Sequence, residues 1–364
     1  IIDQSNGHVK AIIGGRGEKT ASLTLNRATD SARQPGSTFK ILSAYAPALE
    51  NGMTLASVYK DEYYTYENGT QVRDWTGSSY LGNITIRKAI EQSVNVVAVK
   101  VLTELTPRVG YDLLLDFGFT TLVERQEING KIFSDIHQPL ALGGITHGVT
   151  NLELTAAYAT LANGGIYNRP IFYTTVTDSE GKIILENGED SHRVVTDSTA
   201  YLLTSAMEDV VTKGTGTNLR LGTDMPLAGK TGTTSDYNDV WFAGYTPYYT
   251  AVVWAGYDGN QKLAKENNGR TFQQNLWRKI MARVHEDLPV KGFKQPSSVQ
   301  EATVCRRTGL LAGSTCPTVT EYFTEPSIPD KRCTSCYAAW KKAQEEKKKK
   351  EDEMWAFFEK DKIV

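Results

Sequence analysis

The position of the strand-like segments constrains the fold most, because they stand at the two ends of a largely helical chain. Residues 1–15 contain two apolar runs that flank Asn6-Gly7, a strong turn signal, and this predicts a β-hairpin. Residues 239–259 run apolar on either side of a Thr-Pro turn and predict a second hairpin. Strands at both ends with helices between them favour one sheet closed by the N- and C-terminal segments, an α+β plan.

Helical spacing of apolar residues accounts for most of the intervening chain. Residues 53–83 interrupt it, since they are polar and rich in Tyr and Gly, and we expect an irregular surface segment there. Pro47 lies inside the first helical stretch and is expected to kink its last turn. The stretches with helical spacing are 37–49, 84–105, 140–163, 199–211 and 272–284.

Composition excludes several classes of protein. Hydrophobic residues make up 40% of the 364 residues and charged residues 23%, which argues for a sizeable core and against disorder. The 40 Lys+Arg against 42 Asp+Glu give no general attraction to nucleic acid or anionic lipid. No apolar run approaches the ~18 residues of a membrane helix. The chain starts inside a strand-like pattern, so we expect an upstream domain or anchor in the parent protein.

Three regions follow from the changes in composition. Residues 1–290 contain the two hairpins and all the apolar helical stretches. Residues 291–340 are poorer in apolar residues and hold all four cysteines. Residues 341–364 are dense in Lys, Asp and Glu and predict a solvated helix or frayed tail, although the side chains of Trp355, Phe357 and Phe358 could dock against another surface.

The first candidate for chemistry is Ser37-Thr38-Phe39-Lys40, which follows Pro35-Gly36 where a helix is expected to begin. A serine at a helix start directs its hydroxyl and free backbone N–H groups to one point, and Lys40 lies one turn later on the same face. A lysine activates a hydroxyl only if burial or a second cation favours its neutral form. The alternative is an N-capping serine with a surface lysine.

Two further motifs lie far away in the chain. Ser93-Val94-Asn95 places two small polar side chains at a loop or helix start, and simple helix capping is its alternative. The segment 230–234 reads Lys-Thr-Gly-Thr-Thr before the second hairpin. In a strand, Lys230 and Gly232 would share one face, and Gly232 would let a ligand backbone approach closely.

Other readings of these residues fail. A P-loop ending in Lys230-Thr231 requires glycine at position 224, where the chain has Asp224, and a helix where strand signals follow. Gly214-Thr215-Gly216 is too short for a dinucleotide fingerprint. The five histidines show no His-Glu-x-x-His pairing, so we expect neither a catalytic metal nor a cofactor.

In this order, Ser-x-x-Lys, Ser-x-Asn and Lys-Thr-Gly resemble the motif set of penicillin-binding proteins and class A β-lactamases. Flanking segments narrow the resemblance to the transpeptidase domain of class A, bifunctional penicillin-binding proteins, over about residues 1–285. The implied fold is a five-stranded, mostly antiparallel sheet with helices on both faces plus a helical subdomain. The flanking segments that carry the resemblance are 26–29, 33–40, 141–144, 148–165 and 241–247.

The resemblance also implies roles for the motif residues. Ser37 would attack the D-Ala-D-Ala bond of a peptidoglycan stem peptide, Lys40 would accept its proton, and Ser93 would relay a proton to the leaving amine with Lys230 beyond it. Backbone N–H groups of Ser37 and Thr233 would hold the oxyanion. The hydroxyls of Thr231 and Thr233 would take the terminal carboxylate. The implied substrate-binding residues are Asn95, Thr231, Gly232, Thr233 and Thr234.

The same resemblance implies partners and a location. Stem peptides with an acceptor amine would be the substrates, β-lactams would be trapped on Ser37, and no nucleic acid is expected. The parent protein would be membrane-anchored at the extracytoplasmic face of the bacterial membrane, with a glycosyltransferase domain upstream. A D,D-carboxypeptidase, a β-lactamase or a non-enzymatic penicillin sensor could use the same site, and the motifs alone do not separate them.

The four cysteines stand apart from these motifs. For a domain outside the membrane, two disulfides are a natural expectation. Cys333-x-x-Cys336 could instead bind zinc together with Cys305 and Cys316, but the Cys305–Cys316 spacing is wider than zinc sites usually show. The spacing therefore favours disulfides or free thiols over zinc.

Overall fold

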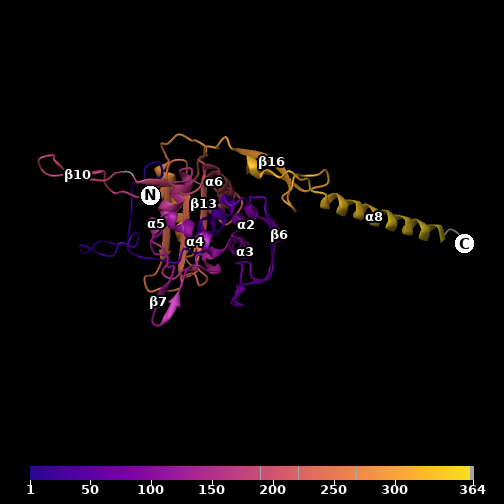
Figure 1. Cartoon of the computed structure of the whole chain (residues 1–364), viewed down its shortest axis with the longest axis horizontal. Coiled ribbons are helices and arrows are strands. Elements are labelled where there is room, and N and C mark those ends of the chain that lie inside the picture. Colours follow the sequence, from indigo (N-terminus) through magenta and orange to yellow (C-terminus); the bar gives the residue numbers. More distant parts are fainter. Residues whose placement is uncertain (189, 220, 267–268, 361–364) are drawn as a thin grey trace.

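The computed structural model describes residues 1–188, 190–219, 221–266 and 269–360, and its centre is a sheet built from the first residues and from strands after residue 227 (Figure 1). Each neighbouring pair of strands is antiparallel, so the α+β prediction and both hairpin predictions are confirmed. The strands, in their order across the sheet, are β13 (Ala228–Thr233), β14 (Asp239–Tyr245), β15 (Thr250–Gly256), β1 (Ile2–Asp3) and β2 (His8–Val9).

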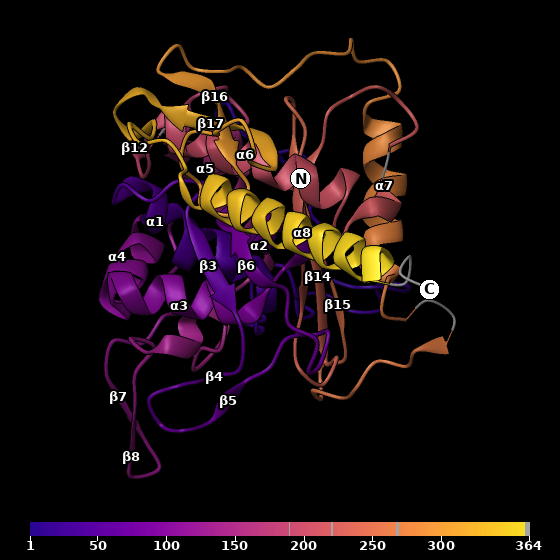
Figure 2. The same cartoon turned by 90° about the vertical axis from the view of Figure 1, so that its right-hand side faces the viewer.

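Both faces of the sheet are covered, and the alternation of side chains along β14 explains why. Trp241, Ala243 and Tyr245 belong to the large core, while Phe242 between them belongs to a second core on the opposite face. There Phe242 packs edge-on against Trp277, with ring centroids 5.0 Å apart. Figure 2 shows β14 and β15 between α7 on one side and the helical part of the molecule on the other. The covering helices are α7 (Phe272–Val284) on one face and α5 (Asn151–Ala162) and α6 (Asp197–Thr212) on the other.

The predicted helix at 37–49 is present but is built from three kinds of helical turn. It runs through η1 (Gly36–Thr38), a π-helix η2 (Lys40–Tyr45) and α1 (Ala46–Glu50). Pro47 lies in the first turn of α1 and has no N–H to donate to the carbonyl one turn earlier, so regular α-helical bonding cannot run through it. The expected irregularity therefore begins before the last turn.

Two predicted helical stretches are each divided. The stretch 84–105 begins in a strand and is then broken at Ser93, whose φ of 55° is left-handed and ends the first helix. The stretch 140–163 is interrupted from Gly143 to Thr150, and within this interval Gly148 has a φ of 90° and a side chain there would collide with the Arg33 backbone. Apolar spacing did not reveal these breaks. The resulting elements are β6 (Gly82–Thr85), α2 (Ile86–Gln92), α3 (Asn95–Leu105) and η3 (Gln138–Leu142) before α5.

The segment 53–83 is not only a surface segment. It forms short antiparallel pairs, and Asp61, Val72 and Asp74 are buried, so the expectation of a surface-lying segment is wrong for these residues. Burial follows because the segment packs over the broken helix pair α2–α3. Its strands are β3 (Val58–Asp61), β4 (Tyr64–Thr65) and β5 (Gln71–Val72), with β3 paired to β6.

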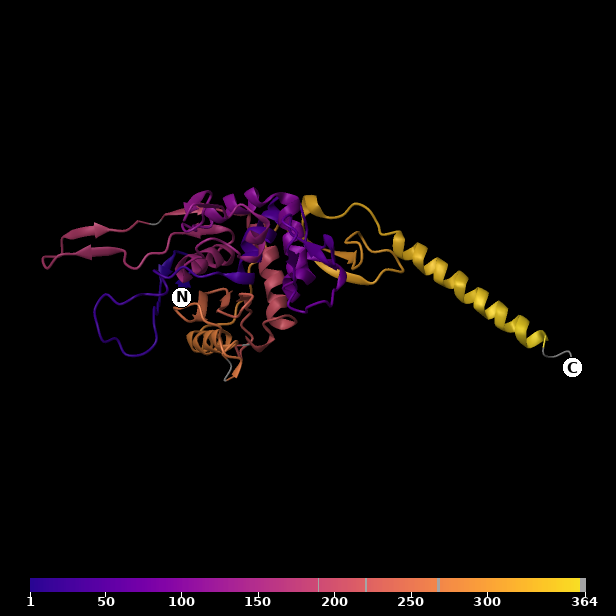
Figure 3. The ribbon, with the colours of Figure 1, turned by 90° about the horizontal axis from the view of Figure 1, so that it is seen from below.

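The remaining elements of the main body are one helix and several small hairpins. The β10–β11 hairpin projects from one end of the molecule (Figure 3). These elements are α4 (Pro107–Asp116), β7 (Gln126–Ile128), β8 (Lys131–Phe133), β9 (Ile166–Asn168), β10 (Thr175–Thr177), β11 (Ile183–Glu186), β12 (Ser191–Arg193) and η4 (Thr217–Leu219).

The C-terminal region forms a separate hairpin followed by a long helix that extends away from the body (Figure 1). The helix is exposed along most of its described side chains, including Trp355, as the charged composition indicates. Phe357 and Phe358 lie outside the described side chains. None of the described helices combines the length and the apolar character that crossing a membrane requires. The elements are β16 (Val299–Cys305), β17 (Thr318–Thr324), η6 (Glu325–Ser327) and α8 (Ser335–Lys360).

The packing of α7 on the sheet can be tested at Trp277, which is fully buried and donates its indole N–H to the Ala251 carbonyl at 2.8 Å. Trp277→Ala removes this side chain from the core between α7 and the sheet, and we expect the free energy of unfolding to fall by about 3–5 kcal/mol. Denaturant unfolding measures this. Trp355→Ala on the exposed helix is the control and should stay within about 0.5 kcal/mol of the parent chain; equal effects at both positions would contradict the assigned packing.

Candidate active site

Ser37 and Lys40 are held by a close approach of backbone to backbone. Gly36 has φ +56°, and a Cβ atom there would lie 2.8 Å from the Thr233 carbonyl oxygen, so glycine lets η1 begin directly against β13. Ser37 is half-buried beside this contact. Lys40 follows at the first position of the π-helix and is fully buried.

Ser93 lies between two lysines. The left-handed backbone at this position turns both its carbonyl and its hydroxyl toward Lys40, whose Nζ lies 2.5 Å from the carbonyl oxygen and 3.2 Å from Oγ. Lys230 Nζ from β13 donates to the same hydroxyl at 2.7 Å. The structure thus brings three motifs that are widely separated in the chain together, because Lys40 and Lys230 both contact the hydroxyl oxygen of Ser93.

Asn95 completes the surroundings of Lys40. Its Oδ1 accepts a hydrogen bond from Lys40 Nζ at 2.5 Å, and its Nδ2 donates to the Arg73 carbonyl at 2.5 Å. The side-chain amide is therefore fixed in orientation by a donor on one side and an acceptor on the other. Ser93 and Asn95 do more than cap a helix, since both contact the buried amine.

The Lys-Thr-Gly segment lies as expected for a strand, with Lys230 and Gly232 on the buried face of β13. A Cβ atom at Gly232 would lie 2.6 Å from the Pro35 carbonyl oxygen, so this glycine is required by the packing of β13 on η1. Thr233 is exposed, and Thr231 Oγ1 contacts Thr215 Oγ1 at 2.8 Å. The hydroxyl of Thr234, the last residue of the motif, accepts the Asp239 N–H at 3.0 Å within the turn that joins β13 to β14.

Burial dominates the electrostatics of both lysines. It lowers the pKa of Lys40 to about 7, against the opposing effect of the nearby Asp74 carboxylate. It lowers the pKa of Lys230 well below the usual value, and the positive charge of Lys40 lowers it further. The sequence left burial or a second cation as the two ways to favour a neutral Lys40, and in the structure the cause is burial.

The hydrogen bonds around Lys40 show what a neutral amine could do there. The Ser93 carbonyl and Asn95 Oδ1 can only accept, so they take the two N–H groups of a neutral amine. The lone pair then remains for a hydroxyl proton. This arrangement suits a base that accepts a proton from a serine.

Sequence reasoning missed two residues at this site. Asp74 accepts the backbone N–H of Asn95, and burial raises the pKa of its carboxyl to about 6. Asp74 lies in the polar segment 53–83, where no motif marked it. Thr215 lies beside Thr231, and its Gly-Thr-Gly context was considered only as a nucleotide motif. Their recognition required the tertiary contacts.

The comparisons with known proteins agree with this geometry. Residues 1–282 match the family described as "Penicillin binding protein transpeptidase domain". Residues 295–337 match "Penicillin-binding protein 1A, C-terminal domain".

Individual relatives are similar over most of the chain. Penicillin-binding protein 1A of Clostridium tetani is 34% identical, with 92% of this chain and 44% of the relative covered. Penicillin-binding protein 1A of Aquifex aeolicus is 33% identical, with coverage of 93% and 44%. The chain therefore spans less than half the length of these relatives.

Solved structures share the fold. Penicillin-binding protein 1A from Haemophilus influenzae aligns with a TM-score of 0.79 at 24% identity, covering 91% of this chain and 53% of the other. The PonA1 protein from Mycobacterium tuberculosis, solved in complex with penicillin V, aligns with a TM-score of 0.71 at 24% identity, covering 81% and 79%. The expected sheet with helices on both faces is thus confirmed.

The chain belongs to the penicillin-binding protein transpeptidase family. The family matched by residues 295–337 and the two relatives named above are penicillin-binding protein 1A, a class A protein, so the resemblance noted in the sequence is confirmed.

The buried state of Lys230 generates a stability prediction. Lys230→Met replaces a fully buried amine by an apolar side chain of similar length, and we expect the free energy of unfolding to rise by about 0.5–2 kcal/mol. Because the pKa of Lys230 is lowered on folding, the unfolded chain binds more protons. The free-energy cost of burying Lys230 therefore grows as pH falls below the pKa of about 10.4 that the lysine has in the unfolded chain. The stability difference between the Lys230→Met chain and the parent chain should grow in the same direction.

Urea unfolding at several pH values measures this difference. Lys279→Met, at an exposed position of α7, is the matched control and should show no such pH dependence. A Lys230→Met chain that is less stable than the parent at neutral pH would contradict the electrostatic assignment.

Proposed function

We propose that this chain is a serine-type D,D-transpeptidase domain that cross-links peptidoglycan stem peptides through an acyl-enzyme on Ser37 and is inhibited covalently by β-lactams. The observation that carries the proposal is the Ser93 hydroxyl, which lies 3.2 Å from Lys40 Nζ and 2.7 Å from Lys230 Nζ beside the start of the Ser37 helix. One hydroxyl between two desolvated amines is a proton-transfer arrangement. No cofactor is needed for this chemistry.

In the acylation step, the oxygen of Ser37 attacks the carbonyl carbon between the last two D-alanines. Neutral Lys40 takes the hydroxyl proton through its lone pair. The carbonyl oxygen becomes an oxyanion, which the backbone N–H groups of Ser37 and Thr233 stabilise; each such donor is typically worth about 3–4 kcal/mol. The contact between Gly36 and Thr233 supports this pairing, because it holds η1 and β13 together.

The carbon–nitrogen bond then breaks, and D-alanine leaves with a proton. Ser93 passes that proton from the lysine pair to the leaving nitrogen, with Lys230 sustaining the polarity of the hydroxyl. The acyl group now forms an ester with Ser37. An amine of a second stem peptide attacks the ester, loses its proton to the same relay, and releases Ser37 with a new amide bond.

Substrate binding follows from the groups along β13 and Asn95. Asn95 would bond the substrate amide, and Gly232 would allow the peptide backbone to lie close to the strand. Thr231 and Thr233 would bind the terminal carboxylate, with Thr215 joining them through its contact with Thr231. Thr234 would act indirectly by fixing the end of the strand.

The proposal extends to the parent protein. The chain would form the extracytoplasmic part of a membrane-anchored, bifunctional enzyme with a glycosyltransferase domain upstream, as the resemblance to class A penicillin-binding proteins implies. Residues 1–290 would be the transpeptidase domain, residues 291–340 a small cysteine-containing unit and residues 341–364 a charged tail. α8 begins at Ser335, so the tail and the cysteine unit share one helix.

Mass spectrometry after treatment with penicillin tests the assignment, because the adduct should lie on Ser37. The lifetime of that adduct separates the alternatives: hours indicate a penicillin-binding protein, whereas seconds would indicate a β-lactamase. Turnover of a D-Ala-D-Ala thioester with an added amine distinguishes a transpeptidase from a carboxypeptidase, which passes the acyl group to water. A penicillin sensor would not turn over the thioester, with or without the added amine.

The nucleophile is tested by Ser37→Ala. We expect this change to abolish labelling by a fluorescent penicillin, because the Ser37 hydroxyl is the nucleophile that forms the acyl-enzyme in the proposed mechanism. The thermal melt should be nearly unchanged, since Ser37 is only half-buried. Ser335→Ala, on the distant helix, is the control and should label normally. Unimpaired labelling of the Ser37→Ala chain would remove this residue from the mechanism.

The base is tested by the pH dependence of acylation. Because the pKa of Lys40 is about 7, the neutral amine is lost as pH falls through this value, and the acylation rate should fall with it. Lys40→Ala should slow acylation about 10²–10⁴-fold and remove this limb.

Asp74→Asn sharpens the test. The Asp74 carboxylate raises the pKa of Lys40, so its replacement by a neutral amide should move the acid limb of the rate profile to lower pH. The amide oxygen of the new side chain can still accept the Asn95 N–H. Asp112→Asn, at an exposed site of α4, should leave the profile in place. A profile that does not move in the Asp74→Asn chain would mean that another group is the base.

A further inference from the structure

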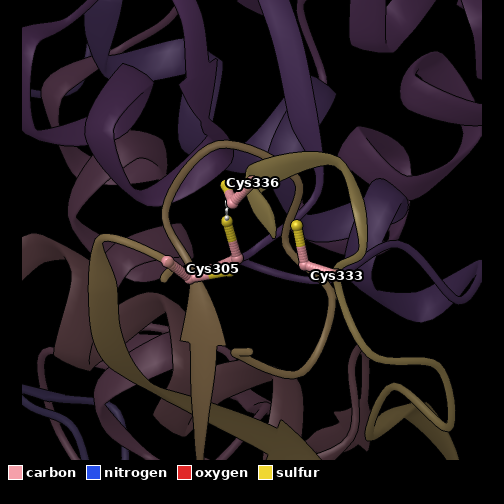
Figure 4. A group of neighbouring side chains, drawn as sticks. Cys305, Cys333 and Cys336 are labelled. Atoms are coloured by element: carbon pink, nitrogen blue, oxygen red, sulfur yellow. Dashed lines mark hydrogen bonds between the residues drawn. The ribbon is translucent and has the colours of Figure 1, made fainter. Parts of the chain in front are cut away.

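The C-terminal unit gathers all four cysteines of the chain in one place. They occupy positions 305, 316, 333 and 336, and each of their sulfur atoms lies within 4.8 Å of the other three. Cys305, Cys333 and Cys336 are buried, and Cys316 is half-buried. Figure 4 shows three of them, with Cys305 at the end of β16 and its sulfur directed at that of Cys336. We propose that these four cysteines bind one zinc ion as a tetrathiolate.

The dimensions of the cluster fit a tetrahedral site. Zinc–sulfur bonds of about 2.3 Å place the sulfur atoms of a tetrathiolate roughly 3.8 Å apart. The Cys305 and Cys336 sulfurs are 3.5 Å apart, and no pair exceeds 4.8 Å. Small shifts of the side chains would therefore complete the tetrahedron without rearranging the backbone.

The fold removes the objection that spacing raised against zinc. Cys305 ends β16, and the chain then turns back through Leu311 before it reaches Cys316. The N–H of Cys305 bonds the Leu310 carbonyl at 2.7 Å, and the N–H of Cys333 bonds the Leu311 carbonyl at 2.8 Å. The wide Cys305–Cys316 interval is thus a folded loop that brings the first two cysteines to the Cys333-x-x-Cys336 pair.

The surroundings favour thiolates. The Gly313 N–H donates to the Cys316 sulfur at 3.3 Å, and the Ser335 hydroxyl lies 3.3 Å from the Cys333 sulfur. Zinc binding by four thiols would release four protons and leave a centre with two net negative charges. Four basic residues lie within two positions of two of the ligands in the sequence, which makes the local net charge of the chain positive: Arg306, Arg307, Lys331 and Arg332.

Disulfides account less well for the same arrangement. A disulfide requires two sulfurs about 2.05 Å apart in a defined pair, whereas here all four thiols are free and gathered around one point. A bound zinc would also add to the stability of the unit. The apolar cluster beside the cysteines is small, with Ala56, Val304 and Phe323 as its buried members among the described residues, and at the other end of β16 Val299 joins the large core of the body.

Metal and thiol analysis of the whole 364-residue chain, purified without chelator, tests the proposal. We expect one zinc per chain by inductively coupled plasma mass spectrometry. Denaturation with a chelator should then expose four thiols to Ellman's reagent. Replacement of zinc by cobalt(II) should produce the visible absorption of a tetrahedral cobalt tetrathiolate. The result does not depend on the proposed transpeptidase activity.

Variants locate the site. The double change Cys333→Ser and Cys336→Ser should lose the zinc, while Thr334→Ala, an exposed position between these two cysteines, should retain it. If the double variant fails to fold, titration of the reduced parent chain with cobalt(II) still decides, because saturation at one ion per chain supports the site. Two disulfides found by non-reducing peptide mapping, or a reduced chain that binds no added zinc or cobalt, would overturn the proposal.

Discussion

The burial of two lysine side chains against a single serine hydroxyl is the constraint on which the rest of the site depends. Lys40 and Lys230 are both 0% exposed, and the Nζ atom of each lies within hydrogen-bonding distance of the Ser93 hydroxyl. Loss of solvation lowers the pKa of each, so the fold accepts an energetic cost at this point. Shifted pKa values of this kind are common at functional sites, and proton transfer at neutral pH is the role that we propose for this pair.

The sheet and the helices are arranged so that this burial is possible. β13 approaches η1 closely because Gly36 and Gly232 leave no side chain between the two backbones. Ser93 reaches both lysines because its left-handed conformation ends α2 abruptly and starts α3 two residues later. The site therefore depends on backbone geometry at three points as much as on its ionisable groups.

The small C-terminal unit is joined to this machinery by a buried ion pair. Arg87 on α2 contacts Glu321 on β17 at 2.6 Å and Asp209 on α6 at 3.0 Å. Because α2 ends at Ser93, the helix that positions the shared hydroxyl is also the helix that holds the β16–β17 hairpin. The stability of that hairpin, with its cluster of cysteines, and the position of α2 are thus physically connected.

The sequence by itself determined the parts that local pattern controls. The terminal hairpins, α6 and α7 follow from alternation, helical spacing and turn residues, and the three motifs identified the family. The divisions at Ser93 and Gly148, the burial of Asp74 and the convergence of the cysteines were decided only by the tertiary structure. The periodicity of apolar residues shows which side of one segment faces the core. The features in the second group depend instead on a distant segment, which packs against the first segment and either leaves room for a side chain or excludes one.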